Sequence, residues 1–426
     1  MPILRDPLWN NIRVEGPYLR LLDTPVFQRL RYVRQLGLAH LVYPGATHSR
    51  FEHALGAYHL ARLTVGVLGD AGAAGSGTVG PEAAASRAAG AFSNEEGRII
   101  VAAALLHDIG HYPFSHALEE LGIRHHEDVA EPLICTGDIA RILRAEFAPD
   151  APERVLALVR GKSTSPLQGL ISGSIDLDKI DYLKRDAMMC GVAYGEIDVE
   201  RLRHALVLVQ DPQAGRLAIG LHEKGLSALE SLLFAKYQMY RNVYWHHAVR
   251  SATAMYKRLI EDALQAGDLV EGALVAYTDE GILDALERAG GSRAPSPLLA
   301  AIRTRRLYKR AMEMPAAELA GVDLEWLAED RERTRAAEDS LAKRHGFRRG
   351  ELLLDFPRKE RMLGLDLPLI TRDGQVRRVT DAGLAGAINL PILAEQLYQS
   401  ARWLRVFTVE RRGIPREVVL DALARG

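Results

Sequence analysis

Four side chains that could bind a metal or move a proton fall close together in AALLHDIGHYPFSHALEE: His107, Asp108, His111 and His116. An apolar run leads up to His107 and Gly110 follows, which indicates a helix end where neighbouring side chains can converge. Imidazole and carboxylate groups together suit a divalent ion of hard to borderline character. A capped core helix with incidental polar residues is the alternative.

Other parts of the chain must complete such a site, because a divalent ion commonly needs several protein ligands and open positions for water. The stretch HSRFEHALG offers His53, and GSIDLDKIDYLKRDA offers Asp176 and Asp178. We expect Asp176 to support a ligand rather than to be one. A His-Asp dipeptide recurs by chance, so these residues are informative only as a set.

Two further stretches place acidic, basic and phenolic groups on one helical face. Asp178, Tyr182 and Asp186 follow one another at intervals of four, and Lys179 stands beside them. The stretch FAKYQMYRNVYWHH repeats this pattern with Lys236, Tyr240 and Tyr244. Such a face suits the wall of a cavity, although a solvated helix with tyrosine at its edge would look the same.

Helical periodicity dominates the first two thirds of the chain, and helices must therefore position these groups. TPVFQRLRYVRQLG predicts a helix that is capped by Thr24, begins at Pro25 and closes at Gly37. RFEHALGAYHLARLTVGVLG predicts a second helix, and SNEEGRIIVAAALLHD a third, with Ser93 and Glu96 at capping-box spacing. Further helices are expected at residues 126–134, 138–147, 152–160, 176–190, 198–208 and 222–266.

The pattern changes after about residue 345. ELLLDF, PLITRDGQVRRV around an Asp-Gly turn, and LRVFTV predict strands, with a helix in AGLAGAINLPILAEQLYQSAR. We therefore expect a mainly α fold, with an all-helical body over residues 1–345 and a smaller α+β region over residues 346–426. A Gly-, Ala- and Ser-rich insertion at about residues 69–92 is expected to lie on the surface.

The composition predicts a soluble globular protein. The 426 residues are 48% hydrophobic and 26% charged, and this length suggests two or three structural regions. A net charge of −1 provides no global basic field for nucleic acid. Two cysteines are too few for a disulfide framework and fit a reducing cytosol. We find neither a signal peptide nor a membrane-spanning run, so we expect a cytoplasmic protein without membrane contact.

In this order, HSRFEH, LLHDIGHYPFSH, HHE and DLDKIDYLKRD resemble the HD-domain phosphohydrolases. The likeness is strongest to the deoxynucleoside-triphosphate triphosphohydrolase branch, which includes a mammalian enzyme with a sterile-alpha-motif domain. It extends from about Asp6 to about residue 310, with DTPVFQRLRYVRQLG and YPGATHSRFEHALG as nearly continuous matches. The resemblance implies an HD-domain all-helical core and metal-dependent hydrolysis of a deoxynucleoside triphosphate (dNTP) to deoxynucleoside and triphosphate.

The resemblance also implies roles for individual residues. One divalent ion (Mn, Fe, Ni, Co, Zn or Mg) would be held by His53, His107, Asp108 and Asp178. His126 of HHE would act as acid to the leaving oxygen, with Asp108 and His111 as further catalytic residues. The implied contacts to triphosphate, sugar and base are Gln35, Arg50, His111, His116, Lys179, Tyr182, Asp186, Lys236, Tyr240 and Tyr244.

Within that set, Gln35 and Asp186 would hold the sugar 3′-hydroxyl, and the ring of Tyr244 would exclude a 2′-hydroxyl. Two positions depart from the mammalian relative. Lys236 replaces an arginine, so a bidentate phosphate contact is lost. Tyr240 replaces a histidine near the base, so base preference does not carry over.

A second, regulatory nucleotide site is implied as well. Asp23, Gln28 and Arg31 match guanine contacts, and Arg305 and Lys309 match phosphate contacts that come from different subunits in the mammalian relative. We therefore expect a guanine-nucleotide effector and a homo-oligomer, a tetramer or a dimer. The alternative is that DTPVFQRLR is an ordinary helix start and RTRRLYKR a solvated basic helix.

Rival functions stay open. Another HD-superfamily phosphatase or phosphodiesterase could act on different nucleotides, and a stepwise nucleotide phosphatase could use nearly the same residues. The Gly-Tyr-Pro motif of one phosphodiesterase type is absent from the sequence. A nucleotide-sensing module without turnover is a third possibility, against which the complete ligand set and His126 argue.

Overall fold

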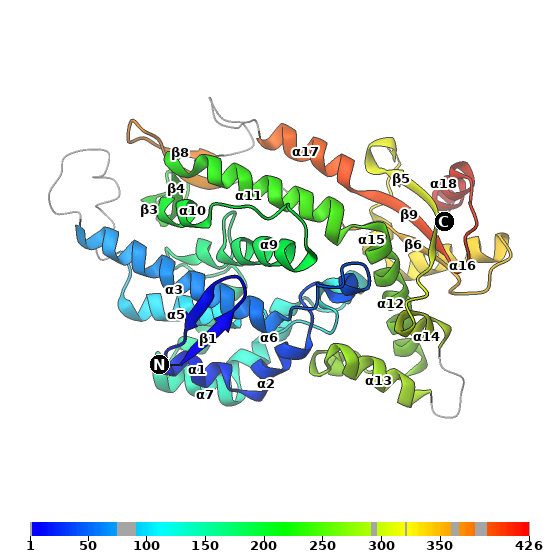
Figure 1. Ribbon diagram of the computed structural model, residues 1–426, viewed down its shortest axis with the longest axis horizontal. Coiled ribbons are helices and arrows are strands. Elements are labelled where there is room, and N and C mark those ends of the chain that lie inside the picture. Colours follow the sequence, from blue (N-terminus) through cyan, green and yellow to red (C-terminus); the bar gives the residue numbers. More distant parts are fainter. Residues whose placement is uncertain are drawn as a thin grey trace.

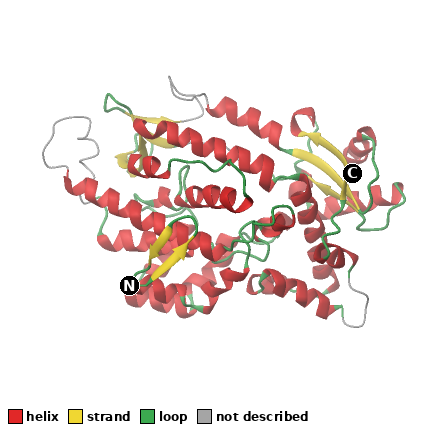
Figure 2. Cartoon of the chain, in the orientation of Figure 1, coloured by secondary structure: helices red, strands yellow, loops and turns green. Residues whose placement is uncertain are grey.

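Helices make up most of the protein, as predicted (Figure 2). The structure, a computed structural model, describes residues 2–74, 91–290, 296–319, 322–358, 366–379 and 390–425. Most of the insertion predicted at about residues 69–92 lies outside these ranges. Among the described helices, none combines the length and the apolar character needed to cross a bilayer.

A short hairpin starts the N-terminal segment. Strands β1 (Ile3–Asp6) and β2 (Asn10–Arg13) are antiparallel, and helices α1 (Gly16–Leu22) and α2 (Pro25–Gln28) follow. The helix predicted to continue to Gly37 is shorter: after Gln28 the chain forms a 3-10 turn, η1 (Arg29–Tyr32), and then leaves the helical conformation. The cause is tertiary, because the next free backbone N–H groups donate to Asp279 and to the His48 carbonyl instead of extending a helix.

Six helices form the core that follows, and the structure gives their bounds as α3 (Arg50–Ala74), α5 (Asn94–Leu106), α6 (His126–Cys135), α7 (Gly137–Glu146), α8 (Ala151–Val159) and α9 (Leu177–Cys190). Helix α5 is largely apolar and packs against α3 and α8. Its start is capped as predicted, since the Ser93 hydroxyl accepts a hydrogen bond from the Glu96 N–H at 3.1 Å. Helix α9 packs between α3 and α11 (Figure 1).

The middle of the chain departs from two predicted helices. Helix α10 (Val199–Ala205) ends early, and its predicted last turn is strand β3 (Leu206–Gln210), which pairs with β4 (Leu217–His222). The alternating apolar run LVLVQ fits such a strand, and a short run of this kind cannot be distinguished from a buried helix by periodicity alone. The long helix predicted at 222–266 is instead α11 (Leu226–Met239), a π-helical turn η7 (Tyr240–Tyr244) and α12 (His247–Ala266).

The remaining described elements alternate helices with short strands. They are α13 (Asp279–Ala289), α14 (Pro297–Arg303), β5 (Lys309–Pro315), α15 (Trp326–Glu329), α16 (Arg331–Arg344), β6 (Leu352–Asp355), β7 (Leu367–Ile370), β8 (Val376–Val379), α17 (Leu390–Ala401), β9 (Trp403–Thr408) and α18 (Arg416–Arg425). The strands predicted after residue 345 are therefore present.

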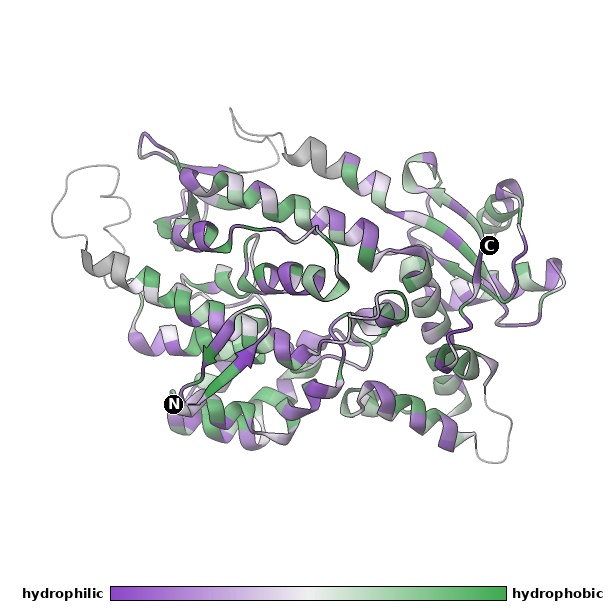
Figure 3. Cartoon of the chain, in the orientation of Figure 1, coloured by the Kyte–Doolittle hydropathy of each residue, from purple (hydrophilic) through white to green (hydrophobic). Residues whose placement is uncertain are grey.

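Two sheets join strands that are distant in the sequence. One has the order β3-β4-β7-β8 and the other β5-β9-β6. Each sheet combines strands from both sides of residue 345, so the part before that residue is mainly helical and not all-helical as predicted. The boundary proposed at residue 345 stays a prediction. Helices with one polar and one apolar face, visible as mixed colours in Figure 3, cover a main core that extends from Ile12 to Ala401.

Candidate active site

Three helices bring the four predicted metal ligands together. His53 lies in the first turn of α3, His107 and Asp108 follow the last residue of α5, and Asp178 lies in the first turn of α9. The Nε2 atom of His53 is 3.2 Å from Nε2 of His107, 2.9 Å from an Asp178 oxygen and 3.6 Å from an Asp108 oxygen. The Nε2 atom of His107 is 3.4 Å from Asp108 and 3.6 Å from Asp178.

These separations fit a single metal ion. Ligand atoms about 2.1 Å from one ion lie roughly 3.0–3.4 Å from one another in octahedral or tetrahedral coordination. The cluster also favours positive charge at its centre. Burial alone would lower the pKa of His53, but hydrogen bonds to Asp178 and Asp181 raise it to about 10. A bound cation would supply that charge and release the proton.

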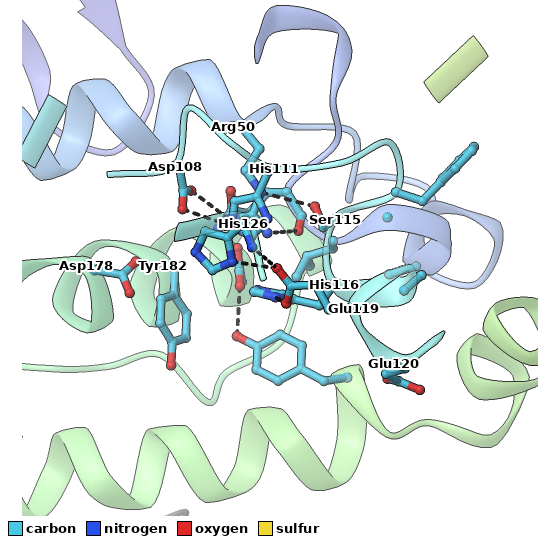
Figure 4. A pocket seen from close by; sticks show the side chains of 18 of the residues that line it. Arg50, Asp108, His111, Ser115, His116, Glu119, Glu120, His126, Asp178 and Tyr182 are labelled. Atoms are coloured by element: carbon cyan, nitrogen blue, oxygen red, sulfur yellow. Dashed lines mark hydrogen bonds and ion pairs between the residues drawn. The ribbon is translucent and has the colours of Figure 1, made fainter. Parts of the chain in front are cut away.

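Asp108 is shared between the metal cluster and two further groups (Figure 4). Nη1 of Arg50 donates to one Asp108 oxygen at 2.6 Å, and Nε2 of His111 lies 3.0 Å from the other. Burial alone would raise the pKa of Asp108, but the charges of Arg50, His107 and His111 hold it well below its usual range. The carboxylate is therefore ionised and available to a metal at neutral pH.

The loop after Asp108 is held in a strained backbone conformation. Phe114 and Ser115 both adopt left-handed φ angles, 57° and 59°. The Phe114 N–H donates to Asp279 at 2.7 Å, and the Ser115 hydroxyl donates to the Arg34 carbonyl at 2.7 Å. These tertiary contacts hold the loop in this strained conformation. They also place the Ser115 hydroxyl oxygen where it accepts a hydrogen bond from Nε of Arg50 at 3.1 Å.

Asp181, which sequence reasoning missed, orients the predicted ligand His53. This fully buried carboxylate accepts from Nδ1 of His53 at 2.8 Å, from Nε1 of Trp9 at 2.5 Å and from the Arg185 guanidinium at 2.8 and 2.9 Å. Arg185 also donates to Asp6 of β1 at 2.8 Å. The spacing of four between Asp181 and Arg185 was the available signal.

Asp176, expected in that supporting role, has a different one. Its side chain caps α9 by accepting from the Lys179 backbone N–H at 2.9 Å, and it also forms an ion pair with the Lys179 ammonium group. Both residues line the pocket described below.

A row of imidazoles continues from the metal cluster. The rings of His111 and His126 stack with centroids 3.8 Å apart. Nδ1 of His126 lies 2.5 Å from Glu119, whose carboxylate also accepts from the His126 N–H at 3.1 Å and contacts Nδ1 of His116 at 2.8 Å. Burial lowers the pKa of both His111 and His126. Sequence reasoning missed Glu119, although it stands three residues after His116.

At another part of the site, Asp186 is held from two sides. Nε2 of His48, a residue that the motifs did not indicate, is 2.7 Å from one oxygen, and the Tyr244 hydroxyl donates to the other at 2.8 Å. Burial, followed by the charge of Asp186, raises the pKa of Tyr244 well above its usual range, so this hydroxyl keeps its proton. Among the described residues, the buried side-chain oxygen of Gln35 has no hydrogen-bond partner and can accept one from a ligand.

Tyrosines and lysines complete the walls. The π-helical turn η7 carries Tyr240 and Tyr244, and π-turns occur frequently at functional sites. The ring of Tyr182 lies 6.4 Å from that of Tyr244, and the ammonium group of Lys236 lies 5.6 Å from the Tyr240 ring. Aromatic faces and cations thus share this wall.

Most of these groups line one pocket of about 580 Å³, a size suited to a small organic ligand. The pocket is lined by every predicted catalytic, metal and substrate residue except His53, which is buried behind them. Further lining residues come from α12 and from the chain after β6, namely Val249, Arg250, Thr253, Pro357 and Arg358.

The five residues predicted for a regulatory site lie elsewhere. Arg31 donates to Gln28 at 2.7 Å and stacks over Phe51, and Asp23 ends α1. Nε of Arg305 donates to the Leu41 carbonyl at 2.6 Å, and Lys309 begins β5. Within the described part of the chain, no hydrogen bond or ion pair joins the two sets. RTRRLYKR is not the basic helix of the alternative interpretation, because α14 ends at Arg303 and a strand follows.

Two known family descriptions match consecutive parts of the chain. The HD domain matches residues 50–186, which contain all four clustered ligands, and the HD associated region matches residues 197–384. The chain therefore contains an HD domain followed by an HD associated region. HD domains bind divalent metal ions, and His53, His107 and Asp108 of this HD domain form a group with metal-binding geometry.

Relatives of this HD-domain protein include uncharacterized and named proteins. YwfO of Bacillus subtilis, an uncharacterized protein, is 35% identical over 270 residues, which is 62% of this chain and 57% of YwfO. Human deoxynucleoside triphosphate triphosphohydrolase SAMHD1 is 28% identical over 309 residues, 64% of this chain and 45% of the human protein. The chain thus spans about half the length of the curated relatives it matches.

Solved structures extend the likeness over nearly the whole HD-domain protein. A hypothetical protein from Aquifex aeolicus has a TM-score of 0.69 and 26% identity and covers 99% of both chains. A phosphohydrolase from Bacteroides thetaiotaomicron has a TM-score of 0.71 over 96% of this chain and all of that chain. At 22% sequence identity, this structural likeness shows a shared fold alone.

Proposed function

We propose that this HD-domain protein hydrolyses deoxynucleoside triphosphates to deoxynucleoside and intact triphosphate. The observation that carries the proposal is a single pocket that joins the four-ligand cluster to polar groups suited to a sugar, Asp186, Tyr244 and Gln35. An enzyme that acted only on terminal phosphates would not need the second set. The activity in the name of the human relative supports the same reaction.

Cationic groups of the chain would bind the triphosphate. Arg50, Lys179 and Lys236 line the pocket together with the metal cluster and would neutralise phosphate oxygens. A divalent ion held by His53, His107, Asp108 and Asp178 would polarise a phosphoryl oxygen and lower the pKa of an attacking water.

His126 would provide the proton for the leaving group. Its Nδ1 is held by Glu119, which leaves Nε2 available to a substrate. When water attacks the α-phosphorus, the bond from phosphorus to the 5′-oxygen breaks, and His126 donates a proton to that oxygen. The negative triphosphate would favour the protonated imidazole that this step requires.

Asp186 and Tyr244 would select the sugar. The carboxylate, fixed by His48 and the Tyr244 hydroxyl, would accept a hydrogen bond from the 3′-hydroxyl, with Gln35 as a second acceptor. The Tyr244 ring would occupy the space of a 2′-hydroxyl, so we expect deoxynucleotides to be preferred over ribonucleotides.

We also propose regulation by a guanine nucleotide in a homo-oligomer. Asp23, Gln28 and Arg31 would contact the base, and Arg305 and Lys309 of another subunit the phosphates. Because such a nucleotide would contact two subunits at once, its binding would shift the equilibrium between separate subunits and the homo-oligomer toward the homo-oligomer. Light scattering and dNTP turnover, each with and without GTP, test this; a protein that stays monomeric at one constant rate would refute it.

The reaction itself is tested by product analysis. Manganese-loaded protein is incubated with each dNTP and each ribonucleotide, and the products are separated by ion-exchange chromatography. Triphosphate and deoxynucleoside in equal amounts are expected. Release of single phosphates would instead indicate a stepwise phosphatase, and nucleotide binding without products would indicate a sensing module.

A further inference from the structure

A network of four charged groups links strand β6 to the turn that holds His126. Arg250 of α12 is 5% exposed, and its guanidinium contacts two carboxylates. Nε and Nη2 donate to Asp355, the last residue of β6, at 3.0 and 2.5 Å. Nη1 and Nη2 donate to Glu120 at 2.8 Å each, and Lys257 donates to Glu120 at 2.7 Å.

Glu120 belongs to the same 3-10 turn, η4 (Glu119–Leu121), as the residue that holds His126. Glu119 faces the histidines, and Glu120 is directed away from them (Figure 4). The turn is therefore fixed from two sides, by His126 and His116 on one and by Arg250 on the other. Displacing Glu120 would displace Glu119, because their backbones are adjacent.

We propose that Asp355 is a positioning residue for the reaction: through Arg250 and Glu120 it fixes η4, and thereby Glu119 and His126. Its kinetic consequence rests on the proposed function. Arg250 lines the pocket, but its donors are already used by two carboxylates, so it orients protein groups and leaves phosphate binding to other cations. The C-terminal region thus takes part in the chemistry by aligning the general acid.

Burial explains why each member matters. Asp355 is 2% exposed, and two cations and two anions are joined within the hydrogen-bonded network, with the buried Arg405 as a further cation near Asp355. Removing one charge from such a buried set leaves its partner uncompensated, and the partner moves toward whatever charge remains. Without the Asp355 charge, Arg250 is held by Glu120 alone, so η4 is free to shift with it. A displacement near 1 Å can cost on the order of a hundredfold in rate.

The chain offers a matched control at the other end of the same helix. Glu261 of α12 accepts two hydrogen bonds of 2.9 Å from Arg331 and is similarly buried, yet neither residue lines the pocket. Glu261→Gln therefore removes a comparable charge from a comparable pair. Within the described residues this pair makes no hydrogen bond or ion pair to η4, and the charge of Glu120 acts on Arg331 only through space.

The experiment measures melting temperature and steady-state dNTP hydrolysis of the full-length, manganese-loaded protein. Asp355→Asn and Glu120→Gln should each lower kcat by about tenfold or more and leave KM within about twofold. The double variant should be no slower than the slower single variant, because both act along one path. Adding Asp355→Asn to His126→Ala should have no further effect. Glu261→Gln should lose stability but keep kcat.

Additive losses in the double variant, or an equal loss of kcat in Glu261→Gln, would reduce the network to a purely structural role and overturn the proposal. Crystal structures of the variants test the positioning role separately from the proposed function, because they can be determined whether or not the protein hydrolyses a nucleotide. The contact between Glu119 and His126 should be lost in Asp355→Asn and kept in Glu261→Gln. A kept contact in Asp355→Asn overturns the positioning role, whereas a parent protein inactive on every nucleotide overturns the function alone.

Discussion

Replacing Gly56 with alanine should weaken metal binding without altering a ligand. Gly56 lies in α3, three residues after His53, and a Cβ atom there would lie 1.8 Å from Oδ1 of Asp181 and 2.6 Å from Nη2 of Arg185. Real Cβ atoms do not approach other atoms so closely, so the carboxylate must move. The same carboxylate holds Nδ1 of His53, and the ring would lose the contact that orients it.

Two opposing effects set the change in stability. Alanine favours the helix over glycine by about 1 kcal/mol. Disturbing a buried ion pair costs about 3–5 kcal/mol, so Gly56→Ala should lower the free energy of unfolding by roughly 2–4 kcal/mol. Losing the partner that orients a metal-bound histidine typically costs about 10–100-fold in metal affinity.

Gly66 of the same helix provides the control. An added Cβ at this exposed position meets nothing within 4 Å, so Gly66→Ala should be neutral or stabilising by up to about 1 kcal/mol. Both variants are freed of metal with a chelator, titrated with Mn²⁺ in a calorimeter and unfolded in urea. Equal affinity for Mn²⁺ in the two variants would refute the assignment of Asp181 as the group that orients His53.

Three further predictions concern the pocket and its supports. His126→Ala should keep its bound Mn²⁺ and lose about a hundredfold or more in kcat, as expected for a lost general acid; unchanged turnover would remove His126 from the mechanism. Arg358 lines the pocket and, among the described residues, has no hydrogen-bond or ion-pair partner, so Arg358→Ala should raise KM by up to about tenfold and leave kcat nearly unchanged in dNTP assays. Burial raises the pKa of Asp279 to about 6, so the stability that this carboxyl contributes is complete below about pH 4 and lost as the pH rises through about 6. The melting temperature of the parent protein should therefore exceed that of Asp279→Asn by less and less as the pH rises from about 4 to about 6. A difference in melting temperature that stays constant over this pH range would contradict the prediction.

The main features of the site were accessible from the sequence because they depend on local spacing. His107 and Asp108 mark a helix end, and the intervals of four from Asp178 to Asp186 place three groups on one face of α9. Local signals also predicted α6 to α9 within a residue or so, since each has an apolar face and a recognisable start. These features need no knowledge of distant contacts.

The residues that support the site depend on contacts far along the chain, which spacing cannot reveal. Trp9 reaches Asp181 across 172 positions, and His48 reaches Asp186 across 138. Glu119 was not singled out in the sequence, because it is the fold that places His126 against it. Strand β3 was predicted as a helix turn because its short apolar run fits either conformation, and pairing with β4 decides between them.

The late position of Asp355, Pro357 and Arg358 has a consequence for the nascent chain. The four predicted metal ligands have all left the ribosome once Asp178 has, whereas the pocket wall after β6 emerges later, by roughly 10–30 s at typical rates of synthesis. A growing polypeptide could therefore capture a metal ion well before it can enclose a nucleotide or align His126. Synthesis itself would keep the enzyme silent until the sheet of β5, β9 and β6 has closed.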